Sequence, residues 1–387
     1  MGFAYSKRLQ KLPPYLFAEI DKTKKKAVSA GKDVIDLGVG DPDFPTPKNV
    51  INELQKAAED SANHRYALNA GMPELREAMT KWYLNRFGVK LNPETEVLPL
   101  IGSKEGIAHF PLAFINPGDQ VLIPEPAYPV YCSATWFAGG EPVFMPLLEN
   151  NGYLPDLEQV EKEKCDRLRM MFLNYPNNPT SALCGLDFFK QVVSFAEKNN
   201  IIICHDAAYT EMYFGDKEPP SFFQAKGAKE VGIEFHSLSK TYNMTGWRIG
   251  FAVGSKNLIA GLAKVKANVD SGIFGAIQCA GIEALTNSSG EYEKFRETYR
   301  KRRNVFVEGM NRIGWNVPFP EATFYVWIPV PPGYSSTELV MTLLEKAGIV
   351  MTPGNGFGPS GEGYIRAALT VSEDRLEEAV DRIRKLK

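Results

Sequence analysis

The residues best suited to chemistry in this chain lie around Lys240. This lysine directly follows a strand-like run, residues 234–239, and sits in a serine-rich turn. An amine held partly out of water has a lowered pKa, which makes it a nucleophile toward a carbonyl group. Ser237, Ser239 and Arg248 are close in sequence, and hydroxyls with a guanidinium form an anion site. The segment favours an aldehyde that also carries a phosphate, although a lysine in a surface loop is the ordinary alternative.

Polar groups also follow two other apolar runs. Asp206 ends the run 200–206, and Tyr209 comes three residues later. A carboxylate at a buried strand end needs a cationic partner, such as a protonated ring nitrogen, whereas the same pattern taken alone is a strand-end cap. Asn178 lies in a proline-rich turn after the run 169–176, and this is a common loop composition. Each feature by itself leaves a structural role open.

A third feature joins the apolar run 97–102 to a predicted helix. Ser103 and Lys104 begin that helix after Gly102. Free N–H groups and a partial positive charge at a helix N-terminus favour a phosphate, and the two side chains add donors. An N-cap is the alternative.

The elements that must position these groups alternate along the middle of the chain. Short apolar runs at 97–102, 120–124, 169–176, 200–206, 234–239 and 249–254 are separated by segments with helical periodicity. This pattern predicts an α/β fold in which helices cover both faces of a mostly parallel sheet. Ligands bind outside the carboxyl ends of such strands, so residues from distant segments are expected to converge there.

The flanking segments predict a smaller unit. Residues 281–387 read as a long polar helix, a strand-like run at 324–330 and further short elements, which is an α+β pattern. The first 45 residues are too few for a separate domain and are expected to pack on this unit. The predicted organisation is an arm at 1–45, a large cofactor-binding domain at 46–280 and a small domain at 281–387.

Composition excludes several classes. The chain has 387 residues and a net charge of −2, so no basic excess exists to bind nucleic acid. Five cysteines without a C-x-x-C pair predict a reduced, intracellular protein. No signal-like or membrane-spanning stretch occurs, which predicts a cytoplasmic location and no membrane partner. Four histidines lack metal-ligand spacing, and Cys204, His205 and Asp206 alternate across a strand, so no metal is expected.

Residues 237–254, SLSKTYNMTGWRIGFAVG, resemble the Schiff-base segment of class I aminotransferases, in the fold-type I pyridoxal-phosphate superfamily. The resemblance extends over about residues 10–385 and implies pyridoxal 5′-phosphate, with amino transfer between an L-amino acid and a 2-oxo acid. It implies that Lys240 binds the cofactor as a Schiff base and moves the reacting proton, while Asp206 pairs with the ring nitrogen. The implied cofactor-binding residues are Tyr66, Ser103, Lys104, Tyr128, Asn178, Asp206, Tyr209, Ser237, Ser239, Lys240 and Arg248.

The same resemblance implies substrate contacts and an assembly. Arg366 and Gly40 match residues that hold the α-carboxylate, and Tyr66 matches a tyrosine that reaches the neighbouring subunit's phosphate. A homodimer with shared active sites is therefore expected. The implied substrate-binding residues are Tyr15, Gly40, Asn69, Lys104, Asn178 and Arg366.

Within this family, residues 12–20 (LPPYLFAEI) and the Gly-Ser-Lys of residues 102–104 are similar to enzymes that transfer the amino group of LL-diaminopimelate to 2-oxoglutarate in lysine biosynthesis. Three positions depart from related patterns: Asn69 replaces an acidic residue of the plant-type enzymes, Ser181 replaces a glycine, and Ala267 replaces an arginine common in aspartate aminotransferases. Aspartate, alanine or aromatic substrates stay open, as does a pyridoxal-phosphate lyase. A ligand-sensing regulator would need a DNA-binding module, for which only about 35 residues precede the turn at 38–41.

Overall fold

The computed structural model describes residues 3–12, 16–67, 70–162 and 167–386. Its helices are α1 (Lys7–Gln10), α2 (Leu16–Ser29), α3 (Lys48–Glu59), α4 (Pro73–Phe87), α5 (Ser103–Phe114), α6 (Val130–Phe137), α7 (Leu157–Lys162), α8 (Leu186–Asn199), α9 (Ala228–Val231), α10 (Leu238–Thr241), α11 (Lys256–Lys266), α12 (Gly275–Asn287), α13 (Ser289–Arg312), α14 (Ser336–Thr342) and α15 (Glu373–Arg384). Its strands are β1 (Ile35–Asp36), β2 (Val97–Leu100), β3 (Gln120–Glu125), β4 (Glu141–Pro146), β5 (Leu168–Asn174), β6 (Ile202–Asp206), β7 (Gly232–Ser237), β8 (Gly250–Gly254), β9 (Tyr325–Pro329), β10 (Ile349–Val350), β11 (Thr352–Pro353) and β12 (Tyr364–Ala368).

A seven-stranded sheet forms the larger unit. Its strand order is β2-β8-β7-β6-β5-β3-β4, and only β8 runs antiparallel to its neighbours. The predicted α/β fold with a mostly parallel sheet is confirmed. Asn174 and Asp206 are paired in register as the last residues of β5 and β6, so the parallel arrangement brings both side chains to one edge of the sheet.

Each face of this sheet is buried under helices. Met171 and Leu173 of β5 pack into a cluster with residues of α4 and α8, whereas Met170 and Phe172 pack into another with residues of α5 and α11. Successive side chains of a strand point to opposite faces, which explains why β5 is apolar throughout. Covering both faces leaves only the strand ends open to a ligand.

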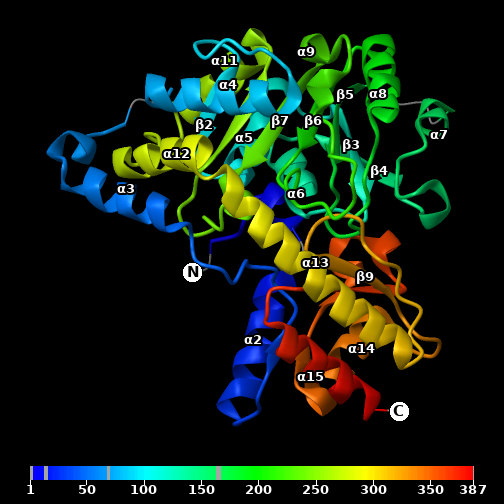
Figure 1. Ribbon diagram of the computed structural model, residues 1–387. Helices are drawn as coiled ribbons and strands as arrows, with labels where there is room; N and C mark the ends of the chain where they lie inside the picture. The colour runs from blue at the N-terminus through cyan, green and yellow to red at the C-terminus, as the bar shows by residue number, and fades with distance from the viewer. Residues whose placement is uncertain (1–2, 13–15, 68–69, 163–166, 387) are drawn as a thin grey trace.

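The smaller unit contains the antiparallel sheet β11-β12-β9, with α13, α14 and α15 close to it in Figure 1. Helix α13 extends from the end of α12 to this unit (Figure 1). Near the N-terminus, β1 pairs in parallel with β10, while Arg8 donates to the carbonyl of Phe137 in the larger unit at 3.2 Å. The domain boundaries at residues 45 and 280 stay predictions. Among the described helices, none has a stretch that is long and apolar enough to cross a bilayer.

Candidate active site

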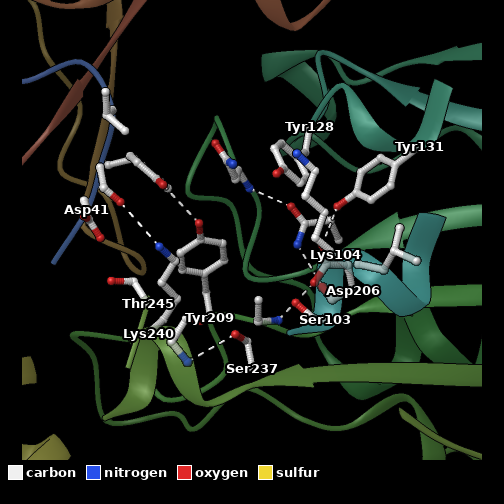
Figure 2. Close-up of a pocket in the computed structure, with 18 of the residues that line it drawn as sticks. Asp41, Ser103, Lys104, Tyr128, Tyr131, Asp206, Tyr209, Ser237, Lys240 and Thr245 are labelled. Carbon is white, nitrogen blue, oxygen red and sulfur yellow. Dashed lines mark hydrogen bonds between the residues drawn. The ribbon is translucent and has the colours of Figure 1, made fainter. Parts of the chain in front are cut away.

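A cavity of about 400 Å³ opens at the carboxyl ends of β5, β6 and β7, beside the N-terminus of α5. Figure 2 shows Lys240, Asp206 and Ser103 arranged around it, each from a different element. Twelve of the residues implied by sequence line the cavity: Gly40, Ser103, Lys104, Tyr128, Asn178, Asp206, Tyr209, Ser237, Ser239, Lys240, Arg248 and Arg366. These residues come from separate segments of the chain and meet at one cavity, as the sequence pattern predicts.

Lys240 lies on the short helix α10, immediately after β7. Its Nζ donates to the carbonyl oxygen of Gly40 at 3.4 Å and lies 5.5 Å from the ring centroid of Phe324. Burial lowers the pKa of Lys240, because removal from water disfavours the charged ammonium. The lowered pKa favours the neutral amine, which can act as a nucleophile or as a proton carrier.

Asp206 supplies a buried negative charge at the end of β6. Its carboxylate accepts from the hydroxyl of Tyr131 at 2.8 Å and from the backbone N–H of Ala208 at 3.2 Å. Burial raises the pKa of Asp206, and the Tyr131 hydroxyl opposes that rise. Among the described residues Asp206 forms no salt bridge, so a protonated pyridine nitrogen fits this carboxylate.

Hydroxyls, a guanidinium and a helix N-terminus gather on another wall of the cavity. Ser103 begins α5 after Gly102, which has a φ of 79°. A Cβ at residue 102 would collide with the Arg248 guanidinium, so the glycine permits the close approach of that cation. Ser237 accepts from the backbone of Ser239 at 3.2 Å and caps α10. This donor set fits the phosphate of the cofactor.

Arg366 occupies the remaining end of the cavity. It lies on β12, is 1% exposed, and donates to Asn178 Oδ1 at 2.8 Å and to the Gly38 carbonyl at 2.7 Å. Its guanidinium carbon is 4.1 Å from the ring centroid of Tyr325. Burial lowers the pKa of Arg366. A planar cation held in this way suits a carboxylate.

Two tyrosines of the site escaped sequence reasoning. Tyr131 lies on α6, and Tyr128 precedes that helix by two residues; no local signal distinguished Tyr131 from a core tyrosine. Tyr325 begins β9, and its hydroxyl lies 3.0 Å from that of Tyr209. Its aromatic run indicated a strand and nothing more. The further lining residues are Val39, Asp41, Ile107, Asn174, Ala208 and Thr245.

Among the implied residues that the structure describes, Tyr66 alone does not line this cavity. Tyr66 is 90% exposed and lines a separate surface hollow with His64 and residues 271–274. Tyr15 and Asn69 lie outside the described residues. Lys104 does line the cavity, and its Nζ is 5.6 Å from the ring centroid of Tyr128.

The histidines have structural partners. His205 and His236 both bond the buried carboxylate of Glu234, at 2.8 and 2.7 Å, and these bonds help to lower the pKa of Glu234 despite its burial. His109 bonds Glu105 at 2.9 Å. No group of metal-ligating side chains occurs within the part of the chain that the structure describes.

The chain is similar to known aminotransferases over its whole length. The model of aminotransferase classes I and II matches residues 32–383. LL-diaminopimelate aminotransferases of Syntrophobacter fumaroxidans and Aquifex aeolicus are each 56% identical, with complete coverage of both chains.

Solved structures agree with these matches. A substrate-bound BacF structure from Bacillus subtilis superposes with a TM-score of 0.96 at 38% identity, covering 100% of this chain and 98% of that one. A mutant aspartate aminotransferase of Thermus thermophilus gives 0.94 at 29%, with complete coverage of both. The matched region contains the lysine, the buried carboxylate and the phosphate-binding wall. The chain therefore belongs to the aminotransferases of classes I and II, and its cofactor is pyridoxal 5′-phosphate.

Proposed function

We propose that this aminotransferase uses LL-diaminopimelate as its amino donor and 2-oxoglutarate as its acceptor, in lysine biosynthesis. The observation that carries the proposal is the identity of 51–56% over 97–100% of the chain to five LL-diaminopimelate aminotransferases. The cytoplasmic location expected from the sequence stays a prediction.

The donor groups of the cavity support a division of labour among its residues. Ser103, Ser237, Ser239 and Arg248 would hold the phosphate, and Asp206 would hold the protonated ring nitrogen. When bound, pyridoxal 5′-phosphate supplies an electron sink for the negative charge that develops at the substrate α-carbon. Ser103, Asp206 and Ser239 are buried, which limits the access of water and strengthens their electrostatic interactions.

Lys240 would accept the proton from the substrate α-carbon and donate it to the C4′ carbon of the cofactor. Its lowered pKa supports this role, because a neutral amine can accept a proton at the working pH. Arg366, Asn178 and Gly40 would orient the α-carboxylate. Every α-amino acid has that carboxylate, so these residues carry no substrate selectivity.

Selectivity must come from the distal end of the substrate, where a second ammonium and a second carboxylate need partners. Lys104 lines the cavity beside Tyr128 and is our candidate for the distal carboxylate, whereas Tyr15 and Asn69 stay candidates from sequence alone. Lys104→Gln should lower kcat/KM for LL-diaminopimelate and 2-oxoglutarate more than for alanine, which lacks a distal carboxylate. An equal loss for all three would instead assign Lys104 to the cofactor.

The substrate proposal is tested with a panel of amino donors. We expect kcat/KM with 2-oxoglutarate to be highest for LL-diaminopimelate, compared with its meso isomer, glutamate, aspartate, alanine and phenylalanine. A clear preference for any of the last three would reject this substrate and leave the aminotransferase assignment standing. Product formation without a 2-oxo acid would indicate lyase chemistry.

We also propose a homodimer in which Tyr66 completes the partner's site. The exposure of Tyr66, at 90%, supports an intersubunit role, because an aromatic residue left open to water is available for burial by a partner. Light scattering should give about twice the 43.1 kDa chain mass.

The shared site has its own test. Tyr66→Ala and Lys240→Ala should each be inactive alone, and mixing them after dissociation should restore about a quarter of the wild-type activity. A fully active monomer, or no recovery from verified mixed dimers, would refute the shared site.

A further inference from the structure

Ser181 has a backbone conformation that favours glycine. Its φ is 64°, and its side chain is 2% exposed. A side chain is disfavoured in this left-handed region because Cβ approaches the backbone too closely. The surrounding contacts must therefore hold residue 181 in place.

Those contacts form a closed hydrogen-bonded ring, which we call the hydroxyl ring, of Ser181, Thr323 and Tyr325. Ser181 Oγ donates to the Tyr325 carbonyl at 2.8 Å and lies 2.7 Å from Thr323 Oγ1. The N–H of Tyr325 donates to Thr323 Oγ1 at 3.0 Å. If the Thr323 hydroxyl donates to Ser181, every member of the ring donates once and accepts once. All three residues are at most 3% exposed, so water is not a ready substitute.

The hydroxyl ring connects two parts of the site that are far apart in sequence. On one side, the N–H of Ser181 donates to the Asn177 carbonyl at 2.9 Å, next to Asn178. On the other side, the ring of Tyr325 lies against the guanidinium of Arg366. Asn178 and Arg366 are themselves bonded at 2.8 Å. The hydroxyl ring thus connects the turn that contains Asn178 to strand β9, whose Tyr325 packs against Arg366.

We propose that Ser181 is a positioning residue, which holds Asn178 and Arg366 at the spacing that a substrate α-carboxylate requires. The inference rests on the proposed role of these two residues toward that carboxylate. A bound carboxylate can compete for the direct hydrogen bond between Asn178 and Arg366. The hydroxyl ring is protected from such competition, because Ser181 and Thr323 do not line the cavity and only Tyr325 does. Its geometry can therefore persist when substrate binds.

The test measures KM and kcat for the donor and the acceptor separately in the holoenzyme. Ser181→Gly relieves the backbone conformation and removes the hydroxyl, and Thr323→Val removes the second hydroxyl with little change of shape. Both variants should raise KM for the amino acid and for the 2-oxo acid in parallel, by about three- to tenfold each, because both substrates have the carboxylate. The dissociation constant of the cofactor and its absorption spectrum should stay at their wild-type values.

Two control variants separate positioning from general stability. Thr323→Ser keeps the hydroxyl and should restore wild-type KM values. Ser336→Ala removes another buried serine hydroxyl of the smaller unit, which donates to Glu362 at 2.7 Å, and should lower Tm without changing KM.

Unchanged KM values in both Ser181→Gly and Thr323→Val would overturn the inference, whether or not Tm falls. A rise in KM for only one substrate would also overturn it. Failure of the underlying assignment is distinguishable, because Arg366→Lys would then leave the KM of both substrates unchanged. The test does not depend on LL-diaminopimelate, since any active α-amino acid can serve as the donor.

Discussion

Tyr131→Phe should move the acid limit of cofactor binding to higher pH. The change removes the hydroxyl that donates to Asp206 at 2.8 Å. Among the described residues, the N–H of Ala208, at 3.2 Å, then stays as the donor to this carboxylate. The ring itself should stay in place, because it is fully buried and stacked on Phe172 with centroids 5.1 Å apart. The perturbation is therefore confined to the charge state of Asp206.

The size of the effect follows from the hydrogen bond that is lost. A hydrogen bond to a charged group contributes about 1.5–3 kcal/mol, so its loss should raise the pKa of Asp206 further. The pKa of Asp206 should rise in the variant, because the lost hydroxyl stabilises the ionised carboxylate. Burial already raises this pKa in the wild type. Protonated Asp206 cannot pair with a protonated ring nitrogen, so cofactor affinity should fall as pH decreases through this pKa.

The assay is the dissociation constant of pyridoxal 5′-phosphate for the apoprotein, measured across the whole pH range in which both proteins stay folded. The ratio of the variant to the wild-type constant should approach one at high pH and rise by about tenfold to hundredfold at low pH. Titration of the free cofactor cancels in this ratio. Tyr175→Phe removes a buried hydroxyl that donates to the Tyr153 carbonyl at 2.7 Å, and it should leave the ratio flat. A flat ratio for Tyr131→Phe, or a shift to lower pH, would refute the reasoning.

Three more outcomes are expected. Lys240→Ala should still bind the cofactor but show no turnover. Reduction with borohydride should attach the cofactor covalently to the wild-type protein only, as measured by the mass of the protein. Full turnover by the variant would reject the role of this lysine. Arg366→Lys should raise KM for both substrates by about tenfold or more, because an ammonium cannot replace a planar two-point donor, and steady-state kinetics measure this. Hydrogen bonds from Arg375 and Arg382 lower the pKa of Asp33 from 3.8 to about 2, so this carboxylate stabilises the fold above pH 3.8 and loses that effect as pH falls through about 2. Asp33→Asn should therefore lower the denaturation midpoint at neutral pH. The difference in midpoint between the wild type and the variant should become smaller in acid, and a difference independent of pH would contradict this.

The fold class and most of the cofactor site could be predicted from short windows of sequence. Apolar runs separated by helical segments determine a mostly parallel sheet, because both of its faces must be covered. Once the sheet is parallel, residues just after strands share one edge, and this places Asp206, Asn178 and Lys240 together. The resemblance of residues 237–254 then names the cofactor.

Other parts of the site depended on contacts between distant segments. Nothing near Tyr131 indicates that its hydroxyl meets Asp206, 75 residues away, because the rotation of α6 against the sheet decides where that side chain points. The direction of Tyr325 depends likewise on how the smaller unit packs on the larger one.

By itself, the sequence determined the order of elements, the α/β class and the chemical identity of the cofactor-binding groups. Only the tertiary structure decided that Ser181 bonds Thr323, 142 residues away, and that Tyr66 is exposed outside the cavity of its own chain. The physical reason is that periodicity and turn chemistry act over a few neighbouring residues. The meeting of distant side chains is set by the packing of whole elements, to which every buried residue contributes.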